Sequence, residues 1–326
     1  MTGGVMTRRG FAQSVVVSAA LAPFAARASE PSSADQSDGM ATPLRLVRRT
    51  IEIGLPRPFS VLHVSDTHLT RLSPEDRALM DEKGADWCTR RAKTFAGGAS
   101  ALSAAVSYAK RLRLPLFHTG DLVDFASRAN LSAIGAEMSG ADWFASCGNH
   151  EFRGWHGVAP PLEYGTSREE RDRARAAFAQ FVPNEISVSS RVVGGINFVQ
   201  YDNGGFSDYL GAAQFEAVRR EFAKGLPVVL LCHMPFYTEE LCAALLKNDP
   251  SLSAERIGAA YVQGRPDKPN WAGRLEMSRW LRDQPLLKAV LCGHLHFEFT
   301  SVFSRTANQY VADANYRGTA YRYDFT

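Results

Sequence analysis

The chain has 326 residues, of which 45% are hydrophobic and 22% are charged, and its formal net charge is +3. The first 28 residues contain three arginines and no acidic residue, so the remaining 34 basic and 34 acidic side chains balance. A neutral protein lacks the positive field that attracts a long polyanion, which argues against a stable nucleic-acid partner. The rest of the chain is long enough for one large α/β domain, and no internal repeat is visible.

Residues 1–28 have the three-part pattern of an export signal. The pair Arg8-Arg9 precedes an apolar stretch from Ser14 to Phe24 and a small-residue cleavage site at Ala26 to Ala28. We therefore expect cleavage of this signal, export through the twin-arginine machinery and a periplasmic location.

We expect no membrane span in the mature chain. The apolar stretch of the signal is shorter than the ~20 residues that a membrane span needs, and no other segment approaches that length. An uncleaved signal that tethers the protein is the alternative. Residues 29–43, which are rich in Ser, Asp, Pro and Glu, indicate a disordered spacer, and residues 44–326 indicate the folded domain.

Strand-like and helix-like patterns alternate through this domain. The predicted strands are Val47–Ile53, Phe59–Val64, Leu114–Phe117, Trp143–Cys147, Arg191–Tyr201, Val228–Cys232, Ala289–Cys292, Phe297–Val302 and Gln309–Ala312. The predicted helices are Ala99–Arg111, Leu131–Met138, Ser167–Phe181 and Ala212–Ala223. We expect the first two strands to be neighbours and the last two to be antiparallel. The alternation predicts two packed sheets covered by helices on the outside.

Three long connections have no clear pattern, namely Leu69 to Phe95, Phe152 to Arg168 and Met234 to Pro285. Loops of this kind often select the substrate of an enzyme, although they can also be mere covering structure.

Five polar segments each follow a predicted strand. They are Asp66-Thr67-His68, Gly120 to Asp124, Gly148 to Glu151, His233 and Gly293 to His296. The carboxyl ends of strands are where open α/β sheets bind their ligands. Imidazole and oxygen donors together suit Zn, Mn, Fe, Co or Ni better than Ca or Mg. The pattern predicts a site for two divalent metal ions, which a shared carboxylate can hold about 3.5 to 4 Å apart.

In this order, the five segments resemble the signature of the calcineurin-like metallophosphoesterase superfamily, and the resemblance covers residues 45–326. It implies a layered α/β/β/α sandwich of two mixed sheets flanked by helices, with the metals at the carboxyl ends of the strands. It also implies a phosphatase or phosphodiesterase whose metal-bound hydroxide attacks a small phosphomonoester or phosphodiester.

The resemblance also assigns roles to individual residues. Asp121 would bridge the two metals. The other ligands would be Asp66, His68 and His296 for the first metal, and Asn149, His233 and His294 for the second. His150 would face the substrate, where it stabilises charge or protonates the leaving alkoxide. Asp124 would hydrogen-bond that imidazole, and a plain helix N-cap is the alternative for Asp124.

Several other residues have less specific interpretations. Arg153 and His156 could contact a substrate phosphate or simply lie in a surface loop. His63 and His118 lie within apolar strands and are better interpreted as core histidines. We expect Cys147, Cys232 and Cys292 to be small buried residues beneath the metals. A bridge between Cys88 and Cys242 is left open.

Two other functions are consistent with the same motifs. A nuclease of the superfamily would need a basic groove, which the balanced charge does not indicate. A catalytically silent metal-binding scaffold would be expected to lack ligands or the motif histidine, and all of these positions are intact here.

Overall fold

The computed structural model describes residues 44–152, 168–203, 211–266 and 272–326. The predicted signal and spacer and the predicted substrate contacts Arg153 and His156 lie outside these residues, so export and those contacts stay predictions. Within the described ranges, no helix is long and apolar enough to cross a membrane.

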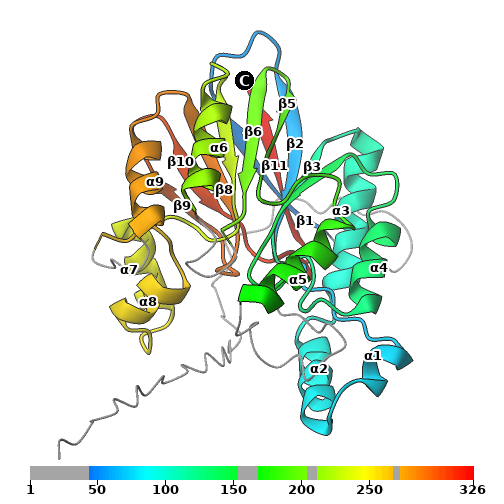
Figure 1. Cartoon of the computed structure of the whole chain (residues 1–326). Helices are drawn as coiled ribbons and strands as arrows, with labels where there is room; N and C mark the ends of the chain where they lie inside the picture. The colour runs from blue at the N-terminus through cyan, green and yellow to red at the C-terminus, as the bar shows by residue number, and fades with distance from the viewer. Residues whose placement is uncertain (1–43, 153–167, 204–210, 267–271) are drawn as a thin grey trace, which may run out of the picture. The chain divides into compact units, whose positions relative to one another are not determined.

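Two mixed β-sheets form the centre of the domain (Figure 1). The first has the order β1-β11-β2-β3-β4. Its strands are β1 (Arg45–Ile51), β11 (Thr319–Phe325), β2 (Phe59–Val64), β3 (Leu116–Thr119) and β4 (Trp143–Ser146). Strands β2, β3 and β4 are parallel to one another, whereas β11 is antiparallel to β2 and parallel to β1. The parallel run brings the ends of β2, β3 and β4 to one edge.

The second sheet has the order β5-β6-β7-β8-β10-β9. Its strands are β5 (Val188–Val193), β6 (Ile196–Tyr201), β7 (Val228–Leu231), β8 (Leu287–Cys292), β10 (Asn308–Val311) and β9 (Phe299–Val302). Strands β6, β7, β8 and β10 are parallel, and the edge strands β5 and β9 are antiparallel to their neighbours.

An apolar layer lies between the two sheets. The ring of Phe117 on β3 stacks on that of Phe198 on β6, with centroids 4.5 Å apart, and Phe325 on β11 packs edge-on against Phe198. Because helices cover the outer faces as well, strands such as β3, β6 and β7 are buried along their whole length, which is typical of parallel strands.

Helices cover the outer face of each sheet (Figure 1). The first sheet carries α3 (Gly98–Leu112), α4 (Arg128–Glu137) and α5 (Arg168–Ala179). The second carries α6 (Ala212–Phe222), α7 (Glu239–Asn248), α8 (Ala254–Ala260) and α9 (Ala272–Arg282). The predicted α/β/β/α fold of two mixed sheets flanked by helices is therefore confirmed.

Two details of the strand prediction are wrong. Strand β1 is not a neighbour of β2, because the C-terminal strand β11 lies between them. The physical reason is burial: β11 contributes Tyr321, Tyr323 and Phe325 to the layer between the sheets, while β1 is largely exposed. The predicted single strand Arg191–Tyr201 is instead part of the β5–β6 hairpin. Its turn at Gly194 and Gly195, with φ of 59° and 88°, uses a backbone conformation that favours glycine.

The long connections also contain helices that the sequence did not reveal. Residues 69–95 include α1 (Pro74–Ala78) and α2 (Glu82–Thr94), and residues 234–285 include α7, α8 and α9. Helix α2 begins at Asp81, whose side chain accepts a hydrogen bond from the Gly84 N–H group.

Candidate metal centre

The five predicted segments meet where the strands of both sheets end. Asp66 and His68 follow β2, Asp121 follows β3, and Asn149 and His150 follow β4. His233 follows β7, and His294 and His296 follow β8. Backbone hydrogen bonds join the segments: the Asp66 N–H donates to Gly120 O, the His68 N–H to Asp121 O, and the Gly293 N–H to His233 O. The centre therefore lies across the ends of two packed sheets.

Five of these residues have an unusual backbone conformation. Among the described residues, only six other than glycine have positive φ, and five of the six are Asp66, His68, Asp121, His294 and His296, with φ between 51° and 73°. Positive φ costs a residue with a Cβ about 1–3 kcal/mol of stability. Residues held in this conformation cluster at functional sites. The fold therefore loses some stability in order to orient these five side chains.

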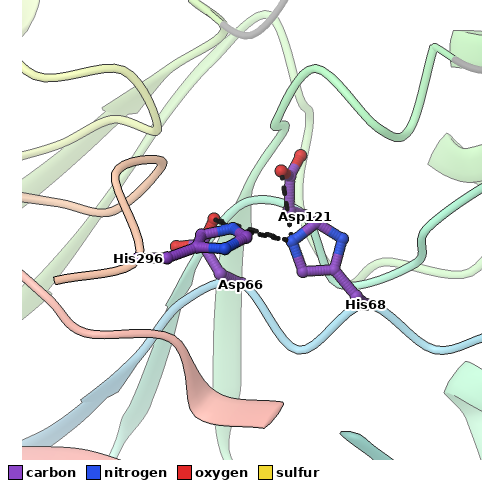
Figure 2. A group of neighbouring side chains, drawn as sticks. All are labelled: Asp66, His68, Asp121 and His296. Carbon is purple, nitrogen blue, oxygen red and sulfur yellow. Dashed lines mark hydrogen bonds and ion pairs between the residues drawn. The ribbon is translucent and has the colours of Figure 1, made fainter. Parts of the chain in front are cut away.

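The donor atoms of the predicted ligands form two groups that share Asp121, and a third group of His68, Asp124 and His150 lies beside them. One atom from each of Asp66, His68, Asp121 and His296 lies within 4.8 Å of the others. Figure 2 shows how these four side chains lie. A second group at the same spacing contains Asp121, His233 and His294. The amide oxygen of Asn149, 3.1 Å from His233 Nε2, joins the second group. All predicted ligands are therefore brought together, and Asp121 stands between the two sets.

Hydrogen bonds from the outer ring nitrogens orient three of the imidazoles. His233 Nδ1 lies 2.8 Å from Thr119 O, and His294 Nε2 lies 2.7 Å from Ala260 O. His68 Nδ1 lies 3.0 Å from an oxygen of Asp124. Because a carbonyl or carboxylate can only accept, each of these nitrogens must carry the proton, and the other nitrogen of the neutral ring turns its lone pair toward the centre.

The inner nitrogens then face one another at short distances. His68 Nε2 is 3.0 Å from His296 Nε2, and His233 Nε2 is 3.1 Å from His294 Nδ1. Two lone pairs at this distance repel unless a proton or a metal cation lies between them. Burial lowers the pKa of His294 to about 4, so without a metal the proton between this pair belongs to His233. A metal cation bound by both rings would take the place of that proton.

The carboxylates supply the negative charge that such cations need. Burial alone would raise the pKa of Asp121, but His233, His150 and His68 together hold it well below its usual range. Burial likewise opposes a proton on His233, yet the Asp121 carboxylate raises the pKa of this imidazole to about 10. The same field that attracts a proton to His233 would attract a metal ion, and a metal ion would displace that proton.

His150 and Asp124 form a pair beside this centre. His150 Nδ1 lies 2.7 Å from Asp124 Oδ1, and its Nε2 lies 3.8 Å from Asp121 Oδ2. The His150 ring therefore presents Nε2 to the centre while Asp124 holds the opposite nitrogen. Asp124 is not the N-cap of α4, because the Ser127 side chain accepts the capping hydrogen bond from the Asn130 N–H group.

Glu151 is a supporting residue to which the sequence pattern gave no role. Its buried carboxylate accepts hydrogen bonds from the backbone N–H groups of Asp121, Leu122, Val123 and Gly148, at 2.6 to 3.2 Å. Burial and the nearby Asp121 raise the pKa of Glu151 to about 8, against the opposing effects of His233 and of the Gly148 and Val123 N–H donors. Through these hydrogen bonds, the Glu151 carboxylate connects the segment after β3 to the segment after β4. Its place directly after His150 was the only signal in the sequence.

Aromatic and basic residues outside the motifs also surround the centre. Phe95 stacks on the His68 ring, with centroids 4.2 Å apart and planes 11° apart. Tyr316 packs edge-on against His68, His296 and Phe95. Arg91 on α2 binds Asp124. The sequence did not indicate a role for these residues, because their neighbours along the chain are polar and follow no regular pattern.

Two histidines, His63 and His118, and three cysteines lie in the interior, as expected. His63 Nε2 is 2.8 Å from Thr119 Oγ1 and His118 Nε2 is 2.9 Å from Thr67 Oγ1, so both are hydrogen-bonded core residues. Cys147, Cys232 and Cys292 are buried. All five cysteines are described and are free thiols, so Cys88 and Cys242 form no bridge.

Close packing around Asp66 leads to a test of how the centre is built. A Cβ atom on Gly293 would overlap Ser65 Oγ and Asp66 Oδ2, whereas one on Gly135, within helix α4, would meet nothing within 4 Å. We expect Gly293→Ala to lower the free energy of unfolding by about 1–3 kcal/mol and to weaken metal binding. Gly135→Ala should raise the free energy of unfolding by up to about 1 kcal/mol. Denaturant unfolding of both variants measures the difference, and equal stabilities would contradict this packing.

Comparison with known proteins agrees with the geometry. The sequence model of the family described as calcineurin-like phosphoesterase matches residues 59–298. Among curated proteins, no relative matches the chain. Similar solved structures include a dimetal phosphatase from Danio rerio, with a TM-score of 0.48 and 15% identity over 79% of this chain and 88% of that one. They also include a phosphopantetheinyl hydrolase from Mycobacterium tuberculosis, with a TM-score of 0.38 and 13% identity over 79% and 90%.

The family match covers most of the domain and includes all five motif segments. The buried Asp and His groups are placed to bind metals, in agreement with the metal dependence of the family. The identities to solved structures are too low to add to this assignment. On the family match, this chain belongs to the calcineurin-like phosphoesterase family.

Proposed function

We propose that the protein hydrolyses a small phosphomonoester or phosphodiester at a centre of two divalent transition-metal ions. The observation that carries this proposal is that Asp121 belongs to both donor groups. Asp66, His68, His296 and Asp121 would hold one ion, and Asn149, His233, His294 and Asp121 the other. When bound, the two cations would supply Lewis acidity and bring a water molecule and the phosphoryl group together.

The protein's own residues would control the proton and the access of water. Asp124 holds His150 Nδ1, and His150 Nε2, which faces the centre, would donate a proton to the leaving oxygen as its bond to phosphorus breaks. Phe95 and Tyr316 cover one side of His68 and His296 with apolar surface. A drier site strengthens the attraction between the centre and the phosphate charge.

A substrate screen tests the proposal. Metal-free protein would be reconstituted separately with Zn, Mn, Fe, Co or Ni and assayed on phosphomonoesters, phosphodiesters and pyrophosphates. We expect hydrolysis of at least one of these substrate classes to require metal. The rate should increase further when a second equivalent of the metal ion binds. Metal binding without hydrolysis in any of these combinations would favour the silent scaffold.

The charge balance predicts how activity depends on salt. Because basic and acidic side chains balance outside the predicted signal, kcat/KM for a small chromogenic ester should change only weakly between about 50 and 200 mM salt. A nuclease that neutralised several phosphates of single-stranded DNA would lose affinity steeply over the same range. Assays of both substrates across this range separate the two functions, and strong, steeply salt-sensitive DNA degradation would overturn the small-substrate proposal.

A further inference from the structure

Arg91 reaches the metal centre from a segment outside the five motifs. It lies in the last turns of α2, the helix that occupies the connection between the segments after β2 and before β3. The helix ends at Phe95, whose N–H donates to Arg91 O at 2.9 Å. Arg91 and Phe95 are thus fixed relative to each other at the end of one helix.

The guanidinium of Arg91 binds both oxygens of Asp124. Its Nε donates to Asp124 Oδ2 at 2.7 Å and its Nη2 to Asp124 Oδ1 at 2.5 Å. The Asp124 side chain is fully buried, and that of Arg91 is only 15% exposed. Two parallel bonds from a planar fork fix both the position and the plane of the carboxylate, which a lysine cannot do.

The carboxylate that Arg91 holds orients two imidazoles. Asp124 Oδ1 lies 3.0 Å from His68 Nδ1 and 2.7 Å from His150 Nδ1. One of these rings belongs to a metal-donor group, and the other presents Nε2 to the centre. If the carboxylate were free to rotate, it could favour one ring at the expense of the other. The fork prevents that rotation.

Arg91 also supports His68 from a second direction. Its guanidinium lies over the Phe95 ring, 4.5 Å from the centroid, and Phe95 in turn stacks on His68. The His68 ring is therefore fixed at its outer nitrogen by Asp124 and on its face by Phe95, and both of these residues touch Arg91.

We propose that Arg91 is a positioning residue of the metal centre, which holds Asp124 so that this carboxylate fixes His68 and His150 together. The expected effect on kcat and KM rests on the proposed function, whereas the expected effect on metal affinity does not. Groups that orient a metal ligand from outside the ligand shell typically change metal affinity by about 10- to 100-fold.

The test compares Arg91→Met with Arg90→Met. Arg90 is the preceding residue of the same helix and is exposed, so its replacement removes the same charge without touching Asp124. We expect Arg91→Met to weaken Mn²⁺ or Zn²⁺ binding by about 10- to 100-fold in calorimetric titration. It should lower kcat more than it raises KM, while Arg90→Met should stay within about twofold on both measures. Equal affinities and rates for the two variants would overturn the proposal.

A double-variant cycle tests whether Arg91 acts through Asp124. In an Asp124→Asn background, Arg91→Met should cause little further loss of metal affinity, since the held carboxylate is already gone. Fully additive losses would contradict the proposed route. In Arg91→Ala protein, added guanidinium should partly restore metal affinity and kcat, and the same salt should not help Asp124→Asn.

The outcomes also separate this inference from the proposed function. If the wild-type protein binds metal but hydrolyses no phosphoester, the proposed function fails while the affinity comparison still decides the role of Arg91. If Arg91→Met does not fold, as its thermal unfolding would reveal, Arg91→Lys decides instead. It keeps the charge but loses the fork, so we expect an intermediate loss of metal affinity, and wild-type affinity would overturn the proposal.

Discussion

Replacement of Asp121 by Asn should deprive the protein of both metal ions rather than one. The Asp121 carboxylate lies within reach of both imidazole sets, with Oδ2 3.3 Å from His233 Nε2 and 3.6 Å from His68 Nε2. Asn has nearly the same shape but no charge, so each ion would lose the anion that it shares. Removal of one member of a buried charge pair costs about 3–5 kcal/mol, and we therefore expect turnover to fall by at least about 10².

Metal analysis after dialysis, beside kinetics, measures this result. Asp86→Asn is a matched control, because Asp86 is an exposed acid on α2, outside both donor groups. The control should keep the metal content and rate of the wild-type protein. An Asp121→Asn protein that held two ions with unchanged affinity would show that Asp121 is not the shared ligand.

Replacement of His150 by Ala should cause a large loss of rate as well, but with nearly full metal content. Its Nδ1 is engaged by Asp124, and its Nε2 faces the centre 3.8 Å from Asp121 Oδ2, which suits proton transfer better than a place among the ligands. Loss of a general acid typically lowers the rate by about 10² to 10⁴. The loss should be greater for an alkyl ester than for a nitrophenyl ester, whose leaving group needs no proton.

The neighbouring residue provides the contrast for this experiment. Asn149→Ala removes the amide oxygen that lies 3.1 Å from His233 Nε2, so this variant should lose metal where His150→Ala does not. If His150→Ala protein lost its metals, or lost the same factor on both esters, the role of proton donor would be wrong.

The sequence predicted those parts of the centre that depend on local pattern. Strand β2 has the predicted bounds, and polar residues directly after β2, β3, β4, β7 and β8 meet at one place. The reason is geometric: the carboxyl ends of parallel strands collect at one edge, so residues far apart along the chain are brought together once each strand is recognised.

The parts that were not predicted depend on contacts between distant segments. The C-terminal strand β11 enters the first sheet between β1 and β2, and only the burial of its tyrosines in the folded state favours that place. Helix α2 has six charged residues among thirteen and buries only Gly84 and Cys88, so it has few apolar residues by which to recognise it. Arg91 and Phe95, which it carries, could not be connected with the centre from their neighbours in sequence.

Diffraction from crystals of the Mn- or Zn-loaded protein, at a wavelength where the metal scatters anomalously, would show directly whether two metal ions share Asp121. We predict two anomalous peaks about 3.5 to 4 Å apart, with one oxygen of Asp121 bound to each and the remaining donors divided as proposed. A single peak, or two peaks that do not share Asp121, would contradict the account.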